Sequence, residues 1–491
     1  MTHYENTRGT KVMSDSLKTP RNLIYEIFVD RFANDDGDSP QLPPTSGPSY
    51  SVHAGGTLRG VVRRLEHIRR LGADAIYLTP IFRAPSNHKY DVACYDEVDP
   101  RFGGDAAFNE LVTECRKHGL GLILDGVFNH LGREHPWFRK ASADAECPEA
   151  RYFLWLDHPN EYECWQSHGT LPELNLEHPD VQAALVTADN SVVRQWLRRG
   201  ATGWRLDCAN DLGPEMCRLI TQTTQEENAC DGTIGEVMAY AEDFARAGCL
   251  TGVMNYYFRS TVLALLSGEI NAAQAATNFK RMVKSYDREV LLKSWNILAS
   301  HDTPRLATLF PNRAQRKLAF CLAFAFCGVP MVYYGEEVSL RGERDPDNRR
   351  PMIWDENQWD EDLLGFIRRL AQLRAQSRAL RMGTYVSLPQ PAFPSVLAFA
   401  RVAEHPADTF VLLANASDQE VQGRFFAPVT HLFDSLPLRD ALEPNRITHM
   451  EGGSLRLSLG PWDVAMLRPE DSRQPRYSYF SGYAYSMGKF Q

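Results

Sequence analysis

Short apolar runs alternate with longer amphipathic segments from residue 23 to about residue 375. Eight of these runs are rich in β-branched or aromatic residues and mostly apolar on both faces, which is typical of a parallel sheet covered on both sides. The runs are 23–30, 73–79, 121–128, 203–208, 232–237, 252–256, 295–300 and 329–335. Segments with helical periodicity separate them, for example 58–72, 105–119, 181–200 and 363–377. The pattern predicts an α/β fold, a (β/α)8 TIM barrel, with a doubly wound open sheet as the alternative.

The rest of the pattern predicts the domain organisation. Residues 1–20 form an N-terminal tail and residues 21–377 the barrel. The connection after the third strand is too long for a loop, so we expect a small inserted domain at about 131–178. Short alternating stretches over 378–470 predict a C-terminal antiparallel β-sandwich. Residues 471–491 are rich in Tyr, Ser and Gly, and we expect a loosely ordered tail or one docked on the barrel or a partner.

Composition excludes several classes of protein. Hydrophobic residues make up 43% and charged residues 23%, which indicates a globular chain with a substantial core. The net charge of −9 and the lack of Lys or Arg blocks argue against nucleic acid and membrane partners. No run is long and apolar enough for a transmembrane helix, and residues 1–20 do not resemble a secretory signal. The 10 cysteines include no C-x-x-C pair, so we expect reduced, buried thiols in a cytoplasmic protein.

Acidic residues end several of the apolar strands. Asp125, Asp207 and Glu236 lie in three different runs, and His301 with Asp302 ends a fourth. Carboxylates are costly to bury, and catalytic groups of such barrels lie at the carboxyl ends of the strands. A structural ion pair explains any one of these acids, but four strands with acids at one edge predict an active site.

The neighbours of two of these acids suggest opposite roles. Arg205 lies two residues before Asp207 on one strand, so both face the same way and the guanidinium should keep Asp207 ionised. Glu236 has an apolar setting that should raise its pKa, as a proton donor requires. An ionised acid about 5 Å from a protonated one is the retaining glycosidase arrangement. Nearby aromatic residues that could stack on sugars, or simply belong to the core, are Tyr90, Trp165, Trp204, Tyr256 and Tyr257.

Several motifs resemble the alpha-amylase family, glycoside hydrolase family 13, and most closely its cyclomaltodextrinase, neopullulanase and maltogenic amylase group. The resemblance spans about residues 21–470. Four motifs are similar to the family's signature regions and occur in the same order, and a further one is similar to the fifth region, in the inserted domain. The motifs are DGVFNH (125–130), GWRLDCAND (203–211), GEVM (235–238) and LASHDT (298–303), with LPELN (171–175), APSNHKYD (84–91) and YYGEEVSLRGERDPDNRRPMIWD (333–355) in support.

The resemblance implies a role for each matching residue. Asp207 would be the nucleophile, Glu236 the general acid/base, and Asp302 the third carboxylate, which binds and distorts the sugar ring. Among the implied substrate-binding residues, Tyr90 would stack on the sugar, and His130 and His301 would bind the same glucose. Asp345 and Arg349 would contact the next sugar on the non-reducing side. Arg205 would orient the nucleophile, and Asp125 would be a structural acid of the site.

The implied activity is retaining hydrolysis of α-1,4-glucosidic bonds in cyclomaltodextrins and maltodextrins, which releases maltose and glucose with some transglycosylation. An exo-acting α-glucosidase or a glucanotransferase is the alternative, and a non-catalytic α-glucan-binding protein a remote one. The expected partner is an oligosaccharide, no cofactor is required, and the oligomeric state is left open.

Three departures from the group limit the expected substrate. The barrel begins near Leu23, so we expect no counterpart of the group's N-terminal β-domain. Met238 stands where the group commonly has Trp, and Asp211 where it has Glu, both on the leaving-group side. A calcium site near the first strand is common in the family, and Asn34, Asp36 and Asp38, with Asp35, offer oxygen ligands. The family's Gly-Gly-Asp reads Gly-Gly-Thr at 55–57, so a structural calcium ion and a plain Asx-rich turn both stay open.

Overall fold

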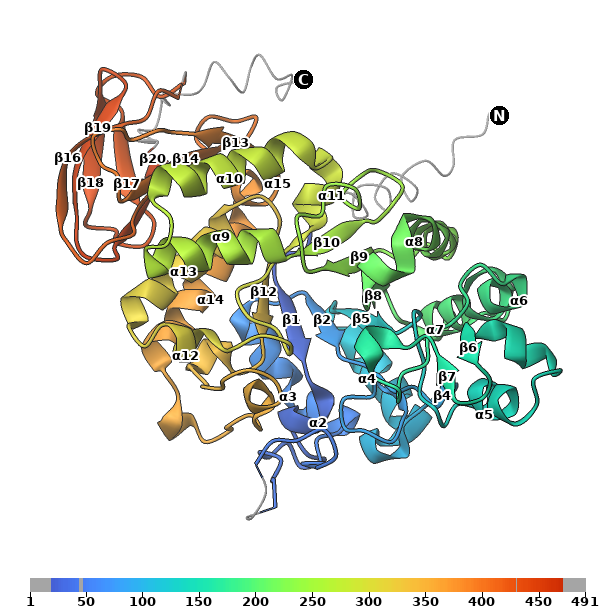
Figure 1. Cartoon of the computed structure of the whole chain (residues 1–491). Coiled ribbons are helices and arrows are strands. Elements are labelled where there is room, and N and C mark those ends of the chain that lie inside the picture. Colours follow the sequence, from blue (N-terminus) through green and yellow to red (C-terminus); the bar gives the residue numbers. More distant parts are fainter. Residues whose placement is uncertain (1–18, 44–46, 430, 471–491) are drawn as a thin grey trace, which may run out of the picture.

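The computed structural model describes residues 19–43, 47–429 and 431–470. Its centre is a closed barrel of eight parallel strands, in which the first strand pairs with both the second and the last (Figure 1). The strands are β1 (Ile24–Ile27), β2 (Ala75–Leu78), β5 (Gly121–Gly126), β8 (Gly203–Leu206), β9 (Gly232–Val237), β10 (Gly252–Asn255), β11 (Trp295–Asn296) and β12 (Val329–Tyr333). All eight predicted strands are present, and the closure confirms the barrel over the open sheet. The predicted tails, apart from residues 19 and 20, lie outside the described residues.

Helices surround the barrel and connect its strands. They are α2 (Val29–Phe32), α3 (Leu58–Leu71), α4 (Gly104–His118), α8 (Ala209–Glu226), α9 (Tyr256–Ser267), α10 (Ala272–Ser285), α11 (Arg288–Lys293), α12 (Leu306–Leu309), α13 (Arg313–Ala325), α14 (Glu361–Gln376) and α15 (Arg378–Met382). Gly72 and Gly119 end α3 and α4 in the left-handed conformation, which glycine adopts without steric cost. Among the described residues, no helix has the length and apolar character needed to cross a bilayer.

The single helix predicted over 181–200 is wrong, because the segment is broken. It forms α6 (Pro179–Gln182), a π-helical turn over 183–187 and α7 (Val192–Arg199). The break falls at Asp-Asn-Ser, residue types whose side chains compete for backbone hydrogen bonds. Ser191 donates its hydroxyl hydrogen bond to the Val186 carbonyl at 2.8 Å, which satisfies an acceptor at the end of the first part.

Two small sheets lie beside the carboxyl ends of the strands. The hairpin β3 (Phe82–Arg83) and β4 (Cys94–Val98) follows β2, and the predicted insertion contains α5 (Pro136–Ala143), β6 (Trp155–Asp157) and β7 (Glu161–Tyr162) (Figure 1). The insertion is packed around Phe138, whose ring lies 5.6 Å from Trp155 and 4.8 Å from Tyr162. The domain boundaries given above stay predictions.

The C-terminal region is antiparallel β-structure that packs against the barrel helices. Its strands pair in the order β13-β14-β15-β20-β17-β18-β19-β16. They are β13 (Thr384–Ser387), β14 (Val396–Val402), β15 (Thr409–Asn415), β16 (Val421–Phe426), β17 (Pro437–Asp440), β18 (Ile447–Glu451), β19 (Ser454–Leu459) and β20 (Val464–Pro469). Phe399 and Leu412 join the core formed with the barrel helices, whereas Ala398 and Leu413 join a separate core inside the β-domain. Strands β14 and β15 are therefore buried on both faces.

The interior of the barrel is apolar toward the amino ends of the strands and polar toward their carboxyl ends. Ile24, Ile123 and Ile234 lie in the apolar cluster that fills the barrel. Side chains two residues further along a strand face the same way. The same strands therefore carry Glu26, Asp125 and Glu236 at their carboxyl ends, and all three are buried.

Candidate active site

The register of β5 against β8 creates the first contact of the polar layer. Asp125 is the partner of Arg205 across these two strands, and Arg205 is fully buried. Trp204 and Leu206 point outward to the helices, so Arg205 and Asp207 both face the barrel interior, as predicted.

The guanidinium of Arg205 contacts three carboxylates. Its Nη1 donates to Asp125 Oδ1 at 2.8 Å and to Asp207 Oδ1 at 2.9 Å. Its Nη2 lies 2.8 Å from Glu236 Oε2. The two predicted catalytic acids therefore lie side by side at the two ends of one guanidinium, which is a bidentate arrangement that lysine cannot reproduce.

The turn after β8 adds a second link between the two acids. Cys208 has a φ of 46°, in the left-handed region, and its amide donates to Glu236 Oε2 at 3.1 Å. Its thiol donates to Asp207 Oδ2 at 3.3 Å. The residue after the predicted nucleophile thus contacts both acids.

Both carboxyl groups bind protons more readily than exposed ones. Burial raises the pKa of Asp207, and Arg205 opposes that rise. Burial also raises the pKa of Glu236, again against Arg205, and Asp302 adds to the rise. The sequence predicted an ionised Asp207 beside Arg205, but one guanidinium divided among three carboxylates does not offset their desolvation. The pair is suited to share a proton, as general acid catalysis requires.

The third predicted acid lies in an ion-pair network. Asp302 Oδ1 is 3.1 Å from Arg349 Nη2, and Asp302 Oδ2 is 3.1 Å from His301 Nε2. Burial raises the pKa of Asp302, but His301 and Arg349 outweigh it and lower the value overall. Burial opposes charge on His301, yet Asp302 and Glu26 raise its pKa, and Glu26 Oε1 lies 2.5 Å from His301 Nδ1. A carboxylate therefore lies beside an imidazole whose pKa is raised.

Tyr90 and Asp125 connect this network to the Arg205 cluster. The Tyr90 ring is stacked on His301 with centroids 5.6 Å apart, and its hydroxyl donates to Asp125 Oδ2 at 2.9 Å. Asp125 also accepts from Tyr77 at 2.5 Å and is 2% exposed. Protein donors occupy both oxygens of Asp125, so it is a positioning residue, in keeping with the structural acid that the resemblance implies, and does not contact substrate directly.

His130 faces the predicted nucleophile from the segment that follows β5. Its Nε2 lies 3.9 Å from Asp207 Oδ2, and neither ring nitrogen has a hydrogen-bond partner among the described residues, although His130 is only 1% exposed. Burial lowers the pKa of His130 to about 3, so the ring is neutral. Unpaired buried nitrogens are costly, which favours a ligand that pairs with them.

Asp345 and Arg349 form a pair at the edge of the site. Arg349 Nε lies 3.0 Å from Asp345 Oδ1, and the Tyr50 hydroxyl donates to Asp345 Oδ2 at 3.1 Å. The structure thus brings the predicted donor-side pair next to Asp302 and adds Tyr50, which is 49% exposed.

Two of the aromatic residues considered for sugar stacking lie in other surroundings. Trp204 is fully buried and packs on Phe128, with centroids 5.3 Å apart. Tyr257 donates to Asn278 Oδ1 at 2.9 Å on the helical side of the barrel. Both are structural, because outward positions of a barrel strand and of the following helix pack among helices.

Comparison with known proteins identifies the family and agrees with the fold. The family model described as "Alpha amylase, catalytic domain" matches residues 26–383. This chain belongs to the alpha-amylase family. It is 34% identical to a cyclomaltodextrinase from Bacillus sp over 410 residues, which cover 80% of this chain and 72% of that protein. It is 35% identical to neopullulanase 2 from Thermoactinomyces vulgaris, over 78% of this chain and 67% of that protein.

A solved structure shares the fold of this chain. The cyclic α-maltosyl-(1→6)-maltose hydrolase from Arthrobacter globiformis, in complex with its cyclic sugar, superposes with a TM-score of 0.79. That match has 28% sequence identity and covers 92% of this chain and 98% of the other. The match to the alpha-amylase catalytic domain and the names of the relatives together indicate that this chain is a glycoside hydrolase.

The predicted calcium loop of this family is held by protein contacts. Asn34 Oδ1 accepts from the amides of Asp36 at 3.1 Å and Asp38 at 2.8 Å, as in an Asx turn. The Arg64 guanidinium donates to the Gly37 carbonyl at 2.6 Å. Calcium needs six to eight free oxygen ligands, and a cationic side chain at this loop opposes a second cation. These residues do not fit a calcium ion well, and we propose that the loop is stable without one.

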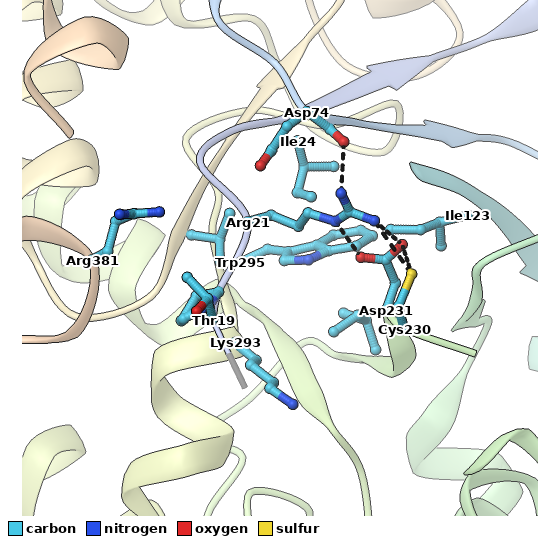
Figure 2. Close-up of a pocket in the computed structure, with 13 residues that line it drawn as sticks. Thr19, Arg21, Ile24, Asp74, Ile123, Cys230, Asp231, Lys293, Trp295 and Arg381 are labelled. Carbon is cyan, nitrogen blue, oxygen red and sulfur yellow. Dashed lines mark hydrogen bonds and ion pairs between the residues drawn. The ribbon is translucent and has the colours of Figure 1, made fainter. Parts of the chain in front are cut away.

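A pocket of about 370 Å³ lies at the opposite end of the barrel (Figure 2). It is lined by Ile24, Ile123 and Trp295 from the apolar part of the barrel. Among its charged groups, Arg21 and Asp231 form an ion pair, with Arg21 Nε 2.6 Å from Asp231 Oδ1. This end of a (β/α)8 barrel serves stability rather than catalysis.

Glu26, Cys208 and Tyr50 are among the residues of the site that were not predicted. Glu26 could have been found, because it is an acid within an apolar strand, which is the criterion that selected the other acids. Cys208 carries no signal beyond its position next to Asp207. Tyr50 lies in a loop whose position depends on distant contacts: Asn87 Nδ2 donates to the Val52 carbonyl at 2.8 Å, and the Asn87 amide to the Tyr50 carbonyl at 3.1 Å.

Proposed function

We propose that this protein hydrolyses α-1,4-glucosidic bonds of cyclomaltodextrins and maltodextrins with retention of anomeric configuration. The observation that carries the proposal is the contact of one buried guanidinium, Arg205, with both Asp207 and Glu236. A retaining mechanism needs two carboxyl groups about 5 Å apart, one as nucleophile and one as acid.

In the first step, Glu236 donates its proton to the glycosidic oxygen while Asp207 Oδ2 attacks the anomeric carbon. The Cys208 amide and Arg205 hold Glu236 and Asp207 in place. A covalent glycosyl-enzyme forms, and Glu236 then removes a proton from water, which attacks the same carbon and restores Asp207. If another sugar replaces the water, the product is a longer glucan, which accounts for transglycosylation.

The remaining residues bind the sugar. Asp302, held by Arg349 and His301, accepts hydrogen bonds from ring hydroxyls and favours the distorted, oxocarbenium-like ring of the transition state. The neutral His130 ring has nitrogens free to pair with the same glucose. Asp345 and Arg349 contact the next sugar on the non-reducing side.

Two residues border the proposed acceptor side. Met238 is 60% exposed, and the Trp165 indole donates to Asp211 Oδ2 at 3.2 Å. An unbranched, flexible thioether can pack against acceptors of different shapes. We therefore expect both water and sugar as acceptors, with release of maltose and glucose.

Support for the substrate class comes from relatives named cyclomaltodextrinase and neopullulanase. The similarity to a cyclic α-maltosyl-(1→6)-maltose hydrolase makes that cyclic tetrasaccharide a second candidate substrate. An exo-acting α-glucosidase or a glucanotransferase would use the same acids. We propose that no cofactor is required and that the protein is cytoplasmic, which a relative named intracellular maltogenic amylase supports.

Chromatography of products from maltotriose, γ-cyclodextrin, pullulan, starch and the cyclic tetrasaccharide tests the proposal. We expect maltose and glucose from γ-cyclodextrin, and Asp207→Asn and Glu236→Gln proteins that lose several orders of magnitude in rate. Near-normal activity of either variant would contradict the assignment. Products longer than the substrate as the main outcome would favour a transferase.

A further inference from the structure

Three side chains that bind metals meet at the predicted nucleophile. His130, Asp207 and Cys208 each offer one ligand atom, and these atoms all lie within 4.8 Å of one another. Cys208 Sγ lies 3.3 Å from Asp207 Oδ2, and His130 Nε2 lies 3.9 Å from the same oxygen. Over the described part of the chain, this is the one group of three His, Cys, Asp or Glu side chains so arranged.

The orphaned imidazole is the second observation. His130 is 1% exposed, and neither ring nitrogen forms a hydrogen bond of good geometry among the described residues, although the Tyr90 backbone partly offsets the fall in the pKa of the ring. A neutral imidazole with an unpaired lone pair is the state in which histidine binds a metal.

The second carboxylate oxygen of Asp207, Oδ2, is also available to bind a metal ion. Asp207 contacts Arg205 through Oδ1, which leaves Oδ2 directed at Cys208 and His130. Arg205 shares its positive charge with Asp125 and Glu236, so the cluster does not carry an uncompensated cation.

The ligand chemistry selects the kind of ion. A sulfur, a nitrogen and a carboxylate oxygen are the ligands of zinc and of similar ions, whereas calcium and magnesium prefer oxygen alone. Tetrahedral zinc places its ligands about 2.0–2.3 Å from the ion, and so roughly 3.3–3.8 Å from one another. The two distances to Asp207 Oδ2 are close to this range, and side chains now as much as 4.8 Å apart would have to approach by about 1 Å. Three protein ligands leave the fourth position of the ion open to water.

We propose that His130, Asp207 and Cys208 form a site for a thiophilic divalent cation of the zinc class, which switches the enzyme off by binding the nucleophile. The ion bonds to His130 Nε2, Asp207 Oδ2 and Cys208 Sγ. The thiol proton is released to solvent, one proton per ion, and nothing is oxidised or reduced. The bound ion occupies the oxygen that would attack the sugar, so metal and substrate exclude each other. The binding part stands on these contacts alone, and the inhibition part rests on the proposed function of Asp207.

Cobalt(II) provides a probe of binding that does not depend on activity. We expect titration of the intact protein with Co²⁺ to give a thiolate-to-cobalt charge-transfer absorption, and Zn²⁺ to displace it. The Cys208→Ala protein should lose the band, with the affinity for Zn²⁺ in chelator competition lowered by roughly tenfold or more. Cys208→Ser serves as a second variant, because it keeps the shape of the side chain and a weak ligand.

Cys230→Ala is the matched control. Cys230 is an exposed thiol 3.6 Å from Asp231 Oδ2, at the far end of the barrel. This variant should bind cobalt as the wild-type protein does. Loss of the band in the control, its persistence in both Cys208 variants, or no band in the wild-type protein at millimolar cobalt would overturn the proposal.

An activity measurement then tests the switch. Zn²⁺ should inhibit maltotriose hydrolysis competitively and reversibly on addition of EDTA, and the inhibition constant of Cys208→Ala should rise by roughly tenfold relative to its own activity. Metal binding without inhibition would refute the switch. An inactive wild-type protein that still shows the cobalt band would refute the proposed function but not the site.

Discussion

Replacement of Arg205 by lysine tests how much the shared guanidinium contributes to catalysis. Lysine keeps the charge but has one nitrogen, so it cannot hold Asp207 and Glu236 at the 2.9 and 2.8 Å that Arg205 provides. One hydrogen bond to a charged group contributes about 1.5–3 kcal/mol. Loss of one such contact, with the other weakened, should cost about 3 kcal/mol in transition-state stabilisation. That figure corresponds to a decrease in kcat/KM of roughly a hundredfold, at about 1.4 kcal/mol for each factor of ten.

The assay is the hydrolysis of maltotriose at saturating and limiting concentrations, with thermal unfolding followed by circular dichroism. We expect Arg205→Lys to lower kcat and to leave KM nearly unchanged, because the aligned Asp207 and Glu236 act in the transition state. Arg374→Lys is the matched control, since Arg374 is equally buried, and its hydrogen bonds within the described part of the chain go to backbone carbonyls, among them Gly328 at 2.7 Å, Leu380 at 2.6 Å and Asn22 at 3.0 Å. It should lower Tm and leave kcat/KM nearly unchanged. A folded Arg205→Lys protein with kcat within threefold of the wild type would refute the reasoning.

Three further predictions concern charge. Burial raises the pKa of Asp207, so its protonated form stabilises the folded protein. This contribution is complete below the pKa of about 4 in the unfolded chain and is lost as the pH rises toward the pKa in the folded protein. Asp207→Asn should therefore raise Tm relative to the wild type at about pH 8 and much less at about pH 4, and an equal rise at both pH values would contradict this. Glu26→Gln removes a group that raises the pKa of His301. The kcat/KM of this variant should therefore fall further below that of the wild type as the pH rises from about 5.5 to about 8. A difference that does not depend on pH would indicate a purely structural role. EDTA or added calcium should not change Tm if Arg64 stabilises the 34–38 loop, and a rise with calcium would show a bound ion.

The barrel could be predicted because its strands are buried on both faces. Runs such as 121–128 and 329–335 are apolar throughout, and few other structures use eight of them in alternation with helices. The break at 188–191 could not be seen in the periodicity, because hydrophobic residues resume in phase on the other side. Only the Asp-Asn-Ser composition signals it.

The acids of the site could be predicted from the cost of burying charge, and Arg205 from the two-residue period of a strand. The contacts that set their protonation could not. The division of Arg205 among three carboxylates depends on the register of β5, β8 and β9, which a sequence does not reveal. Nor does local sequence show that Trp204 faces the helices rather than the sugar, since alternation gives two faces but not which is inside.

Covalent trapping tests the central claim most directly, namely that Asp207 attacks the sugar while Glu236 supplies the proton. The protein is incubated with a 5-fluoro-α-glucosyl fluoride, digested, and its labelled peptide sequenced by mass spectrometry. We predict one glycosyl group per chain, attached to Asp207, and products of the normal reaction released first as the α-anomer. A label on another residue, or initial release of the β-anomer, would contradict the account.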